Sequence, residues 1–435
     1  MGASRSMSEV YSMTREEYEK RTAATRRARI AWWEEAKFGL FIHYGIYSAY
    51  GRGEWIKLRE GISREEYLRT AEEKMTYKTG TAEEWVRCAA DAGMRYAILT
   101  TQHHDGFSLW DSAVNPYNSV AYGPRVDIVR EFCDACRKYG LRIGLYFSLL
   151  NWEHPDGAVC ATDEAARVRF VSDVRERVRE LMTNYGRIDM LWYDVALPLE
   201  TAEAWDSVER NRMVRELQPD ILINERSCLP EDFAIAEDKL IYPPNGIEWE
   251  ACMRFSQTAF GGLDHERGRP YATNAHGIVK LMAQCQFGGG NLVFNISPNA
   301  DGSIDPYERE TLATVGKWVK HHAEAVYGRA DRGNHGANGI STSVRKGNRV
   351  YLWNWIWGGT SMRIGGYGNA PKSVRCITTG EAVDFRYEGG VLYLDNLPSE
   401  SPDRILDFAV FELDFGDEMP RYALIPPNLA GFMNI

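Results

Sequence analysis

Several signals that mark particular classes of protein are missing from this sequence. No apolar run approaches the roughly 20 residues that a membrane-spanning helix needs. No charged stretch followed by an apolar one begins the chain, as it would in a secretory signal. We therefore expect a cytoplasmic protein that has no membrane partner.

Runs of like charge are also missing. The formal net charge is -10, and charges of both signs are interspersed along the chain. Nucleic acids and anionic membranes are bound by clustered lysines and arginines. The sequence therefore predicts no nucleic-acid partner.

Paired cysteines are scarce, although the chain has eight cysteines. They are scattered in mostly apolar segments, at positions 88, 133, 136, 160, 228, 252, 285 and 376. This pattern is typical of free, buried thiols in a reducing compartment. Cys133 and Cys136 have the spacing of a zinc pair, but no second pair follows them. We expect no metal and no cofactor.

What the sequence does have is a large apolar and aromatic content. Its hydrophobic content of 44% is ample for a core. Its length of 435 residues is too great for one domain. The chain contains 13 Trp and 23 Tyr. Such rings beside carboxylates suit a sugar, whose C–H faces stack on them, but a tryptophan-rich core would account for many of them.

Short apolar runs alternate with helical patterns as far as about residue 300. The predicted strands are 38–45, 96–101, 142–148, 190–195, 221–226 and 234–237. The predicted helices are 14–36, 81–93 (with a capping box at Thr81 and Glu84), 126–139, 163–185, 203–217, 273–286 and 306–326. This alternation is typical of a parallel β/α fold, and we predict an imperfect (β/α)8 barrel over residues 1–330.

The pattern changes after about residue 330. Strand-like runs separated by Gly, Asn and Pro take over, at 349–353, 373–377, 391–394 and 405–411. No helical pattern follows residue 339. The sequence predicts a small antiparallel β-sandwich domain over residues 331–435.

Polar residues follow the predicted barrel strands, where a barrel would bring them to one mouth. They are His43 with Glu54 and Trp55, His103 with His104, Tyr146, Asp194, Arg226 and Glu237. Asp194 ends the apolar run 190–193, an expensive place for a carboxylate without a role. A helix N-cap or an ordinary loop acid is the alternative interpretation.

Two carboxyl groups on either side of a sugar can hydrolyse a glycoside. One attacks the anomeric carbon or activates a water molecule, and the other protonates the leaving oxygen. Asp194 is the first candidate, and Glu237 or Glu250 is the second. Arg226 near Asp194 would keep that carboxyl ionised, as a nucleophile requires. Each of these residues could instead be a plain ion-pair partner.

A metal site is an alternative use for His43, His103 and His104. His103 and His104 are neighbours in an extended stretch, so we expect their side chains to point to opposite sides. Hydrogen bonding to a polyhydroxylated ligand fits them better, because imidazole both donates and accepts. Loop histidines with a role in the core remain the third interpretation.

A series of motifs between residues 30 and 328 resembles family 29 α-L-fucosidases, in the same order along the chain. The motifs are residues 37–45 with Glu54 and Trp55, then 103–107, 125–129, 144–148, 191–194, 249–250, 289–298 with 301–302, and 323–328. The resemblance implies an exo-acting, retaining glycosidase on an imperfect barrel with a trailing β domain. Its substrate would be a fucosylated oligosaccharide or glycoconjugate, and the chain could form a homo-oligomer.

The resemblance also implies roles for particular residues. Asp194 would be the nucleophile, with Arg226 beside it. Glu237 would be the general acid/base, with Glu250 as the alternative. The residues implied to bind the sugar are His43, Glu54, Trp55, His103, His104, Tyr146 and Trp249, with Phe41 and Phe260 lining a pocket for its C6 methyl group.

The chain departs from the family pattern in three places. Tyr44 stands where the family usually has Trp, Gly261-Gly262-Leu263 where it often has Gly-Tyr-Asn, and Gly288 where it usually has Lys. We expect the first two departures to lie near the sugar pocket and its aglycone side. They leave two alternatives open: a relative with shifted specificity, such as an α-L-galactosidase, and an inactive carbohydrate-binding barrel.

Overall fold

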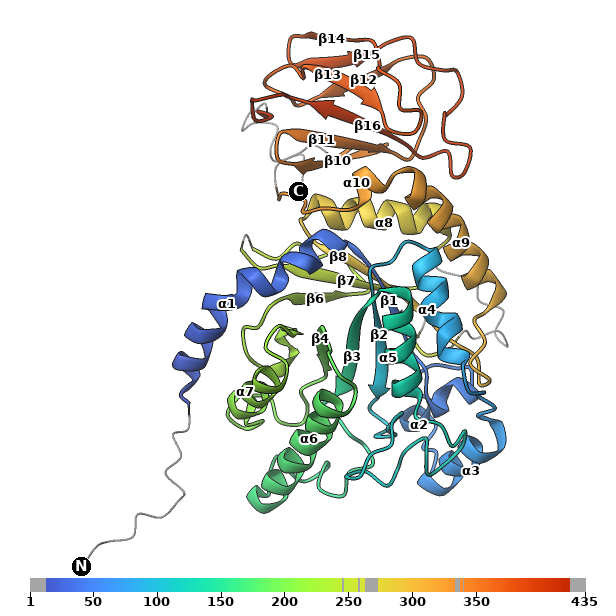
Figure 1. Cartoon of the computed structure of the whole chain (residues 1–435), viewed down its shortest axis with the longest axis vertical. Coiled ribbons are helices and arrows are strands. Elements are labelled where there is room, and N and C mark those ends of the chain that lie inside the picture. The colour runs from blue at the N-terminus through green and yellow to red at the C-terminus, as the bar shows by residue number, and fades with distance from the viewer. Residues whose placement is uncertain are drawn as a thin grey trace, which may run out of the picture.

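A computed structural model describes residues 13–244, 246–256, 259–262, 273–332, 337–338 and 340–422. Its elements form a curled parallel sheet surrounded by helices and a separate antiparallel β layer above helices α8 (Ala275–Phe287) and α9 (Pro306–His321) (Figure 1). Within these residues, every helix is too short or too polar to cross a bilayer.

The parallel sheet has eight strands in the order β5-β4-β3-β2-β1-β8-β7-β6. Their bounds are β1 Phe38–Ile42, β2 Tyr96–Gln102, β3 Arg142–Ser148, β4 Met190–Asp194, β5 Leu222–Ile223, β6 Ala234–Glu237, β7 Trp249–Arg254 and β8 Asn291–Ile296. The edge strands β5 and β6 meet at an isolated bridge between Asn224 and Phe233. The predicted imperfect barrel is thus confirmed.

Helices connect most of the barrel strands. They are α1 Arg15–Ala36, α2 Ile56–Arg59, α3 Arg64–Lys74, α4 Thr81–Asp91, α5 Ile128–Tyr139, α6 Glu164–Asn184, α7 Ser207–Leu217, then α8, α9 and α10 Ala323–Val326. Short 3-10 helices lie at η1 Ile46–Ala49 and η2 Glu225–Ser227. Because η2 replaces an α-helix between β5 and β6, the barrel is irregular on that side.

The start of α4 corrects one prediction. Gly80 is its N-cap and no side chain caps it, so the capping box expected at Thr81 and Glu84 is wrong. The box lies instead at the start of α1, where the Thr14 side chain accepts from Glu17 N and the Glu17 carboxylate accepts from Thr14 N.

Alternation along each strand separates the barrel interior from its outer face. Along β4, Met190 and Trp192 pack into the interior cluster, and Leu191 and Tyr193 pack into the outer core. Trp33 of α1 belongs to the interior cluster. Helix α1 therefore contributes to the filling of the barrel as well as to its outer wall.

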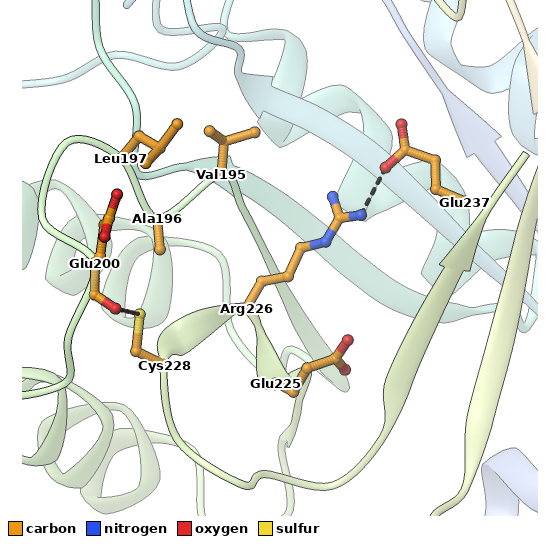
Figure 2. Close-up of a pocket in the computed structure, with 8 residues that line it drawn as sticks. All are labelled: Val195, Ala196, Leu197, Glu200, Glu225, Arg226, Cys228 and Glu237. Atoms are coloured by element: carbon orange, nitrogen blue, oxygen red, sulfur yellow. Dashed lines mark hydrogen bonds and ion pairs between the residues drawn. The ribbon is translucent and has the colours of Figure 1, made fainter. Parts of the chain in front are cut away.

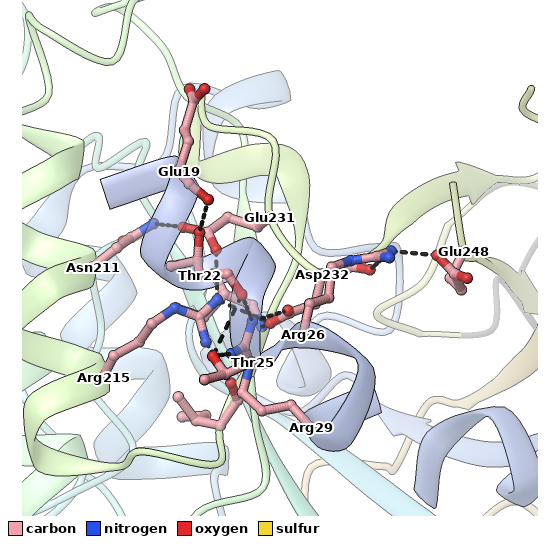
Figure 3. Close-up of polar contacts among 12 residues, drawn as sticks. Glu19, Thr22, Thr25, Arg26, Arg29, Asn211, Arg215, Glu231, Asp232 and Glu248 are labelled. Atoms are coloured by element: carbon pink, nitrogen blue, oxygen red, sulfur yellow. Dashed lines mark hydrogen bonds and ion pairs between the residues drawn. The ribbon is translucent and has the colours of Figure 1, made fainter. Parts of the chain in front are cut away.

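Buried ion pairs hold the seam between β5 and β6 together (Figure 3). The Asp232 carboxylate accepts from Arg29 of α1 at 2.6 Å and from Arg215 of α7 at 2.9 Å. It also accepts from the backbone N–H of Ile223 in β5 at 3.0 Å. Glu231 accepts from Arg215 at 2.6 Å. These contacts reinforce a short backbone connection, in which Glu225 N donates to Phe233 O and Asp232 N donates to Ile223 O.

The C-terminal strands form two antiparallel sheets, of order β13-β16-β11-β10-β9 and β12-β15-β14. Their bounds are β9 Ala337–Asn338, β10 Ser341–Lys346, β11 Arg349–Asn354, β12 Met362–Gly365, β13 Ser373–Cys376, β14 Phe385–Glu388, β15 Val391–Leu394 and β16 Ala409–Asp414. Side chains of both sheets share one apolar cluster. The predicted β-sandwich is confirmed; the domain boundary near residue 330 stays a prediction.

Aromatic contacts join the β layer to the barrel helices. Trp318 of α9 lies 5.3 Å from the Trp353 ring of β11 and donates its indole N–H to Phe408 O at 2.9 Å. His322 contacts the Thr378 hydroxyl at 2.8 Å. None of Trp318, Trp353 and Phe408 has exposed surface, so this junction is part of the core.

Candidate active site

Asp194 occupies the carboxyl end of β4 and, by alternation with Met190 and Trp192, faces the barrel interior. It is 7% exposed. The N-cap of the next helix, α7, is Asp206, so Asp194 does not cap that helix. A buried carboxylate at the mouth of a barrel needs other partners.

Three side chains surround the Asp194 carboxylate. Tyr146 Oη of β3 donates to Asp194 Oδ2 at 2.7 Å, and Arg226 Nη1 donates to Asp194 Oδ1. His104 Nε2 lies 3.7 Å from Asp194 Oδ2. Burial alone would raise the pKa of Asp194, but the positive charge of Arg226, then His104 and the Tyr146 hydrogen bond, lower it below its usual value. The carboxyl is therefore ionised at neutral pH.

Arg226 bridges Asp194 to the carboxylate of Glu237. Its Nη2 donates to Glu237 Oε2 at 2.6 Å, while its Nη1 binds Asp194. Its guanidinium also lies 5.0 Å from the ring centroid of Trp192. Arg226 was expected to end a strand, but it lies in the 3-10 helix η2. Glu237 does end a strand, β6, and its side chain is 42% exposed.

A compact group of rings lies beside Asp194, over β1 to β3. The His43 ring is 4.6 Å from Phe41, 5.8 Å from His103 and 5.0 Å from Phe260, between ring centroids. Tyr146 stacks on His103 with an interplanar angle of 6°. The predicted histidines and phenylalanines are thus brought together on one side of Asp194.

His103 and His104 do not point to opposite sides, as we expected from an extended stretch. Their ring centroids are 4.1 Å apart. Strand β2 ends at Gln102, and Gly106 N donates to His103 O in a turn, so strand alternation no longer applies. One ligand atom each from His103, His104 and Asp194 lies within 4.8 Å of the others.

The charge state of this group favours hydrogen bonding to a neutral ligand. Burial lowers the pKa of His43 to about 3 and that of His104 to about 4, and it lowers the pKa of His103 well below its usual value. His103 Nδ1 has no hydrogen-bond partner among the described residues. Neutral imidazoles can donate and accept, which suits sugar hydroxyls. The guanidinium of Arg226 on Asp194 disfavours a second cation there.

Glu54 and Trp55 shape the edge of the site. The Glu54 carboxylate accepts from Phe260 N at 2.9 Å and from Gly261 N at 2.7 Å, which fixes the segment that carries Phe260. Trp55 packs against His104 with ring centroids 4.8 Å apart. A side chain at Gly261 would meet the Tyr47 ring at 2.6 Å, so glycine is required there for space.

Comparisons with known proteins identify the family. A family model described as Alpha-L-fucosidase matches residues 6–324. Tissue alpha-L-fucosidase of Rattus norvegicus is 32% identical over 326 residues, which cover 68% of this chain and 69% of the rat protein. This chain belongs to the α-L-fucosidase family.

Solved structures of this glycoside hydrolase family share the fold. Alpha-L-fucosidase isoenzyme 1 from Paenibacillus thiaminolyticus has a TM-score of 0.81 at 30% identity, covering 90% of this chain and 100% of that one. Thermotoga maritima alpha-fucosidase, in complex with a mechanism-based inhibitor, has a TM-score of 0.75 at 26% identity, covering 90% of this chain and 99% of that one.

Two residues that the family motifs singled out lie apart from the others. Trp249 begins β7 and therefore lies at the amino end of the barrel, where its indole donates to Gly288 O at 2.8 Å. Glu250 follows it in the strand. Its Oε1 accepts from the Trp192 indole at 3.3 Å, so Trp192 lies between Glu250 and the layer of Asp194.

The departure from the family pattern at Tyr44 lies outside the sugar pocket. Its ring packs against Tyr77 and Trp85 in the outer core, and its hydroxyl donates to Ala300 O at 2.9 Å. The expectation that Tyr44 borders the pocket is therefore wrong. Gly261 and Gly262 are described, whereas Leu263 lies outside the described residues.

The sequence interpretation missed Asn295 of β8. Its Oδ1 lies 2.6 Å from His43 Nδ1, and its Nδ2 donates to Phe260 O at 2.8 Å. Asn295 therefore links His43 to Phe260 within the ring group. The signal that could have found it is the pair Asn291 and Asn295, two amides on the inward face of an apolar strand.

Proposed function

We propose that the chain is an exo-acting, retaining α-L-fucosidase that removes terminal α-L-fucosyl residues by double displacement. The observation that carries the proposal is the Asp194–Arg226–Glu237 arrangement, in which one guanidinium binds two carboxylates at the barrel mouth. One of them is buried with a lowered pKa, and the other is open to solvent. This asymmetry suits a nucleophile and an acid/base.

In the first step, an Asp194 oxygen attacks the anomeric carbon while Glu237, in its protonated form, gives its proton to the leaving oxygen. An ester joins Asp194 to the sugar, and the aglycone leaves as an alcohol. In the second step, Glu237 takes a proton from water, which attacks the same carbon and frees Asp194. Two inversions give net retention.

The ring group holds the sugar in this scheme. Neutral His43, His103 and His104 exchange hydrogen bonds with its hydroxyls, and the unpartnered Nδ1 of His103 gains one. The apolar faces of Phe41 and Phe260, which both pack against His43, suit the C6 methyl group. A pocket of this kind leaves a C6 hydroxyl without a partner.

Asp194→Ala tests the nucleophile with 4-nitrophenyl α-L-fucoside. We expect turnover to fall by several orders of magnitude, because the covalent step is lost. Azide should restore part of the rate and give a glycosyl azide of inverted configuration. Asp220→Ala is the matched control, because that carboxylate is 74% exposed on another part of the surface. Near-normal turnover in Asp194→Ala would contradict the proposal.

Further measurements separate the remaining alternatives. Glu237→Ala should lose far more activity on substrates with basic leaving groups than on activated aryl fucosides. The same pattern in Glu250→Ala alone would transfer the role to Glu250. Equal rates on the matching α-L-galactoside would indicate shifted specificity. Fucose binding without hydrolysis would indicate an inactive barrel.

A further inference from the structure

A cavity lies beside Arg226, lined by residues at or just after the carboxyl ends of β4, β5 and β6. Its volume is about 480 Å³, within the range of ligand pockets. Figure 2 shows its lining, in which Arg226 reaches between two walls. The lining residues are Val195, Ala196, Leu197, Glu200, Glu225, Arg226, Cys228 and Glu237.

The position of this cavity relates it to the reaction. Val195 directly follows Asp194, and Arg226 and Glu237 belong to both the cavity and the catalytic arrangement. The ring group lies over β1 to β3, whereas the cavity is lined from the segments that follow β4, β5 and β6. A substrate with its terminal sugar on the rings would therefore extend its leaving group past Glu237 into the cavity.

The chemistry of the lining is one-sided. Its charged residues are three glutamates, Glu200, Glu225 and Glu237, and one arginine, Arg226, which is already bound to Asp194 and Glu237. Glu225 Oε1 accepts from Ile235 N at 2.9 Å. Its Oε2 is buried and has no hydrogen-bond partner in the described part of the chain. Because that oxygen is buried, Glu225 contributes negative charge to the cavity rather than an acceptor open to a ligand.

An apolar strip completes the cavity. Val195, Ala196 and Leu197 form one wall, and Leu197 is 45% exposed. The strip offers a surface to the C–H face of a sugar or an aryl ring. Carboxylates together with an apolar strip suit a neutral, hydroxyl-bearing group.

We infer that this cavity is the leaving-group site and that it selects neutral, hydroxyl-bearing aglycones over anionic ones such as uronates, sulfated sugars or sialylated sugars. The inference rests on the proposed function, because a leaving group exists only if the enzyme cleaves a glycoside. The selection follows from like-charge repulsion, because the three glutamates of the lining, Glu200, Glu225 and Glu237, outnumber its one guanidinium.

The test uses two aryl α-L-fucosides that differ in charge but have leaving groups of similar basicity, 3-(hydroxymethyl)phenyl and 3-carboxyphenyl. Burial raises the pKa of Glu225, so the assay is run above neutral pH to favour the ionised form of this carboxyl. We expect kcat/KM to be at least about ten-fold higher for the neutral substrate. The ratio should shrink in 1 M salt, which screens exposed charges.

Variants assign the effect to the cavity. Glu225→Gln keeps an oxygen for Ile235 N but removes the charge, and with Glu200→Gln it should bring the ratio several-fold closer to one. Glu216→Gln is the matched control, because its exposed carboxylate pairs with Arg212 at the far end of α7. This control should keep the wild-type ratio.

The outcomes separate this inference from the proposed function. Hydrolysis of both substrates at equal rates, or a ratio unchanged in Glu225→Gln and Glu200→Gln, would overturn the leaving-group inference and leave the fucosidase intact. Failure to hydrolyse either substrate, and 4-nitrophenyl α-L-fucoside as well, would overturn the proposed function and the inference with it.

Discussion

Glu250 has no exposed surface inside the barrel, and its oxygens accept hydrogen bonds from Trp33, Tyr96 and Trp192. Burial raises the pKa of Glu250 to about 7, although the three hydrogen bonds oppose this rise. The folded protein therefore keeps a proton that the unfolded chain has lost once the pH exceeds about 4.5. Ionised Glu250 thus destabilises the fold.

We predict that Glu250→Gln reduces the dependence of stability on pH. In the wild type, the contribution of Glu250 to the free energy of unfolding is full below pH 4.5, falls as the pH rises to about 7, and is then constant. Glu250→Gln should therefore remove at most about 1.4 kcal/mol per pH unit from the slope of the free energy of unfolding against pH. Thermal unfolding from pH 5 to 7 measures it.

Asp105 and Glu308, whose pKa values burial raises to about 6 and about 8, add slopes of the same sign, so the variant is compared with the wild type. Equal slopes in the wild type and Glu250→Gln would show that Glu250 does not titrate in this range.

Residue patterns located Asp194 and Arg226 because each stands out as a charge near a predicted strand end. They could not choose between Glu237 and Glu250, which are both acids downstream of Asp194. Whether Glu250 can reach the sugar depends on which face of β7 meets Trp192, and that contact is set by the tertiary structure. The amide partners of Glu54 were also hidden, since they lie more than 200 residues away along the chain.

Among the elements, the seam between β5 and β6 depends on one buried carboxylate. Asp232 is wholly buried and binds Arg29, Arg215 and the backbone of Ile223. We predict that Asp232→Ala lowers the free energy of unfolding by about 3–5 kcal/mol, because it leaves two buried guanidinium groups without this partner. Chemical denaturation measures the change.

A surface pair provides the comparison for Asp232→Ala. Arg404 and Glu400 interact at 2.8 Å, but their side chains are 70% and 74% exposed. Glu400→Ala should therefore change stability by less than about 1 kcal/mol. A similarly small effect of Asp232→Ala would mean that the seam does not depend on this ion network.

Six of the eight barrel strands were predicted as continuous apolar runs, because both of their faces are covered, whereas β7 and β8 were not among the predicted strands. The strands of the β-sandwich were harder to predict from the sequence. Strand β10, Ser341–Lys346, is rich in polar residues, and its first four residues are nevertheless buried. Its burial comes from the neighbouring strands and from α8, which a local pattern does not reveal. Strands β12 and β14 are only four residues each.

For the whole molecule, the junction between barrel and sandwich predicts shared stability. Trp353 of β11 is fully buried against Trp318 of α9. Trp353→Ala should cost about 3–5 kcal/mol and lower Tm, while kcat/KM stays near the wild-type value at temperatures where the protein is folded. Calorimetry and a fucosidase assay check both parts.

Ile356→Ala is the control for that junction, because Ile356 is 52% exposed and should tolerate truncation. Two separate unfolding transitions in the wild type, with only one of them shifted by Trp353→Ala, would contradict a shared core. A loss of activity in the folded variant would instead connect the sandwich to catalysis.

Helix α1 also sets an order for the assembly of the protein during its synthesis. Its residues Arg29 and Trp33 find their partners Asp232 and Glu250 203 and 217 positions later in the chain. At a typical rate of translation, the helix waits on the order of 10–40 seconds for them. Until then Arg29 and Trp33 lack the partners that they bind in the folded barrel. A ribosome-bound chain that ends before Glu250 therefore presents α1 as a target for chaperones and proteases.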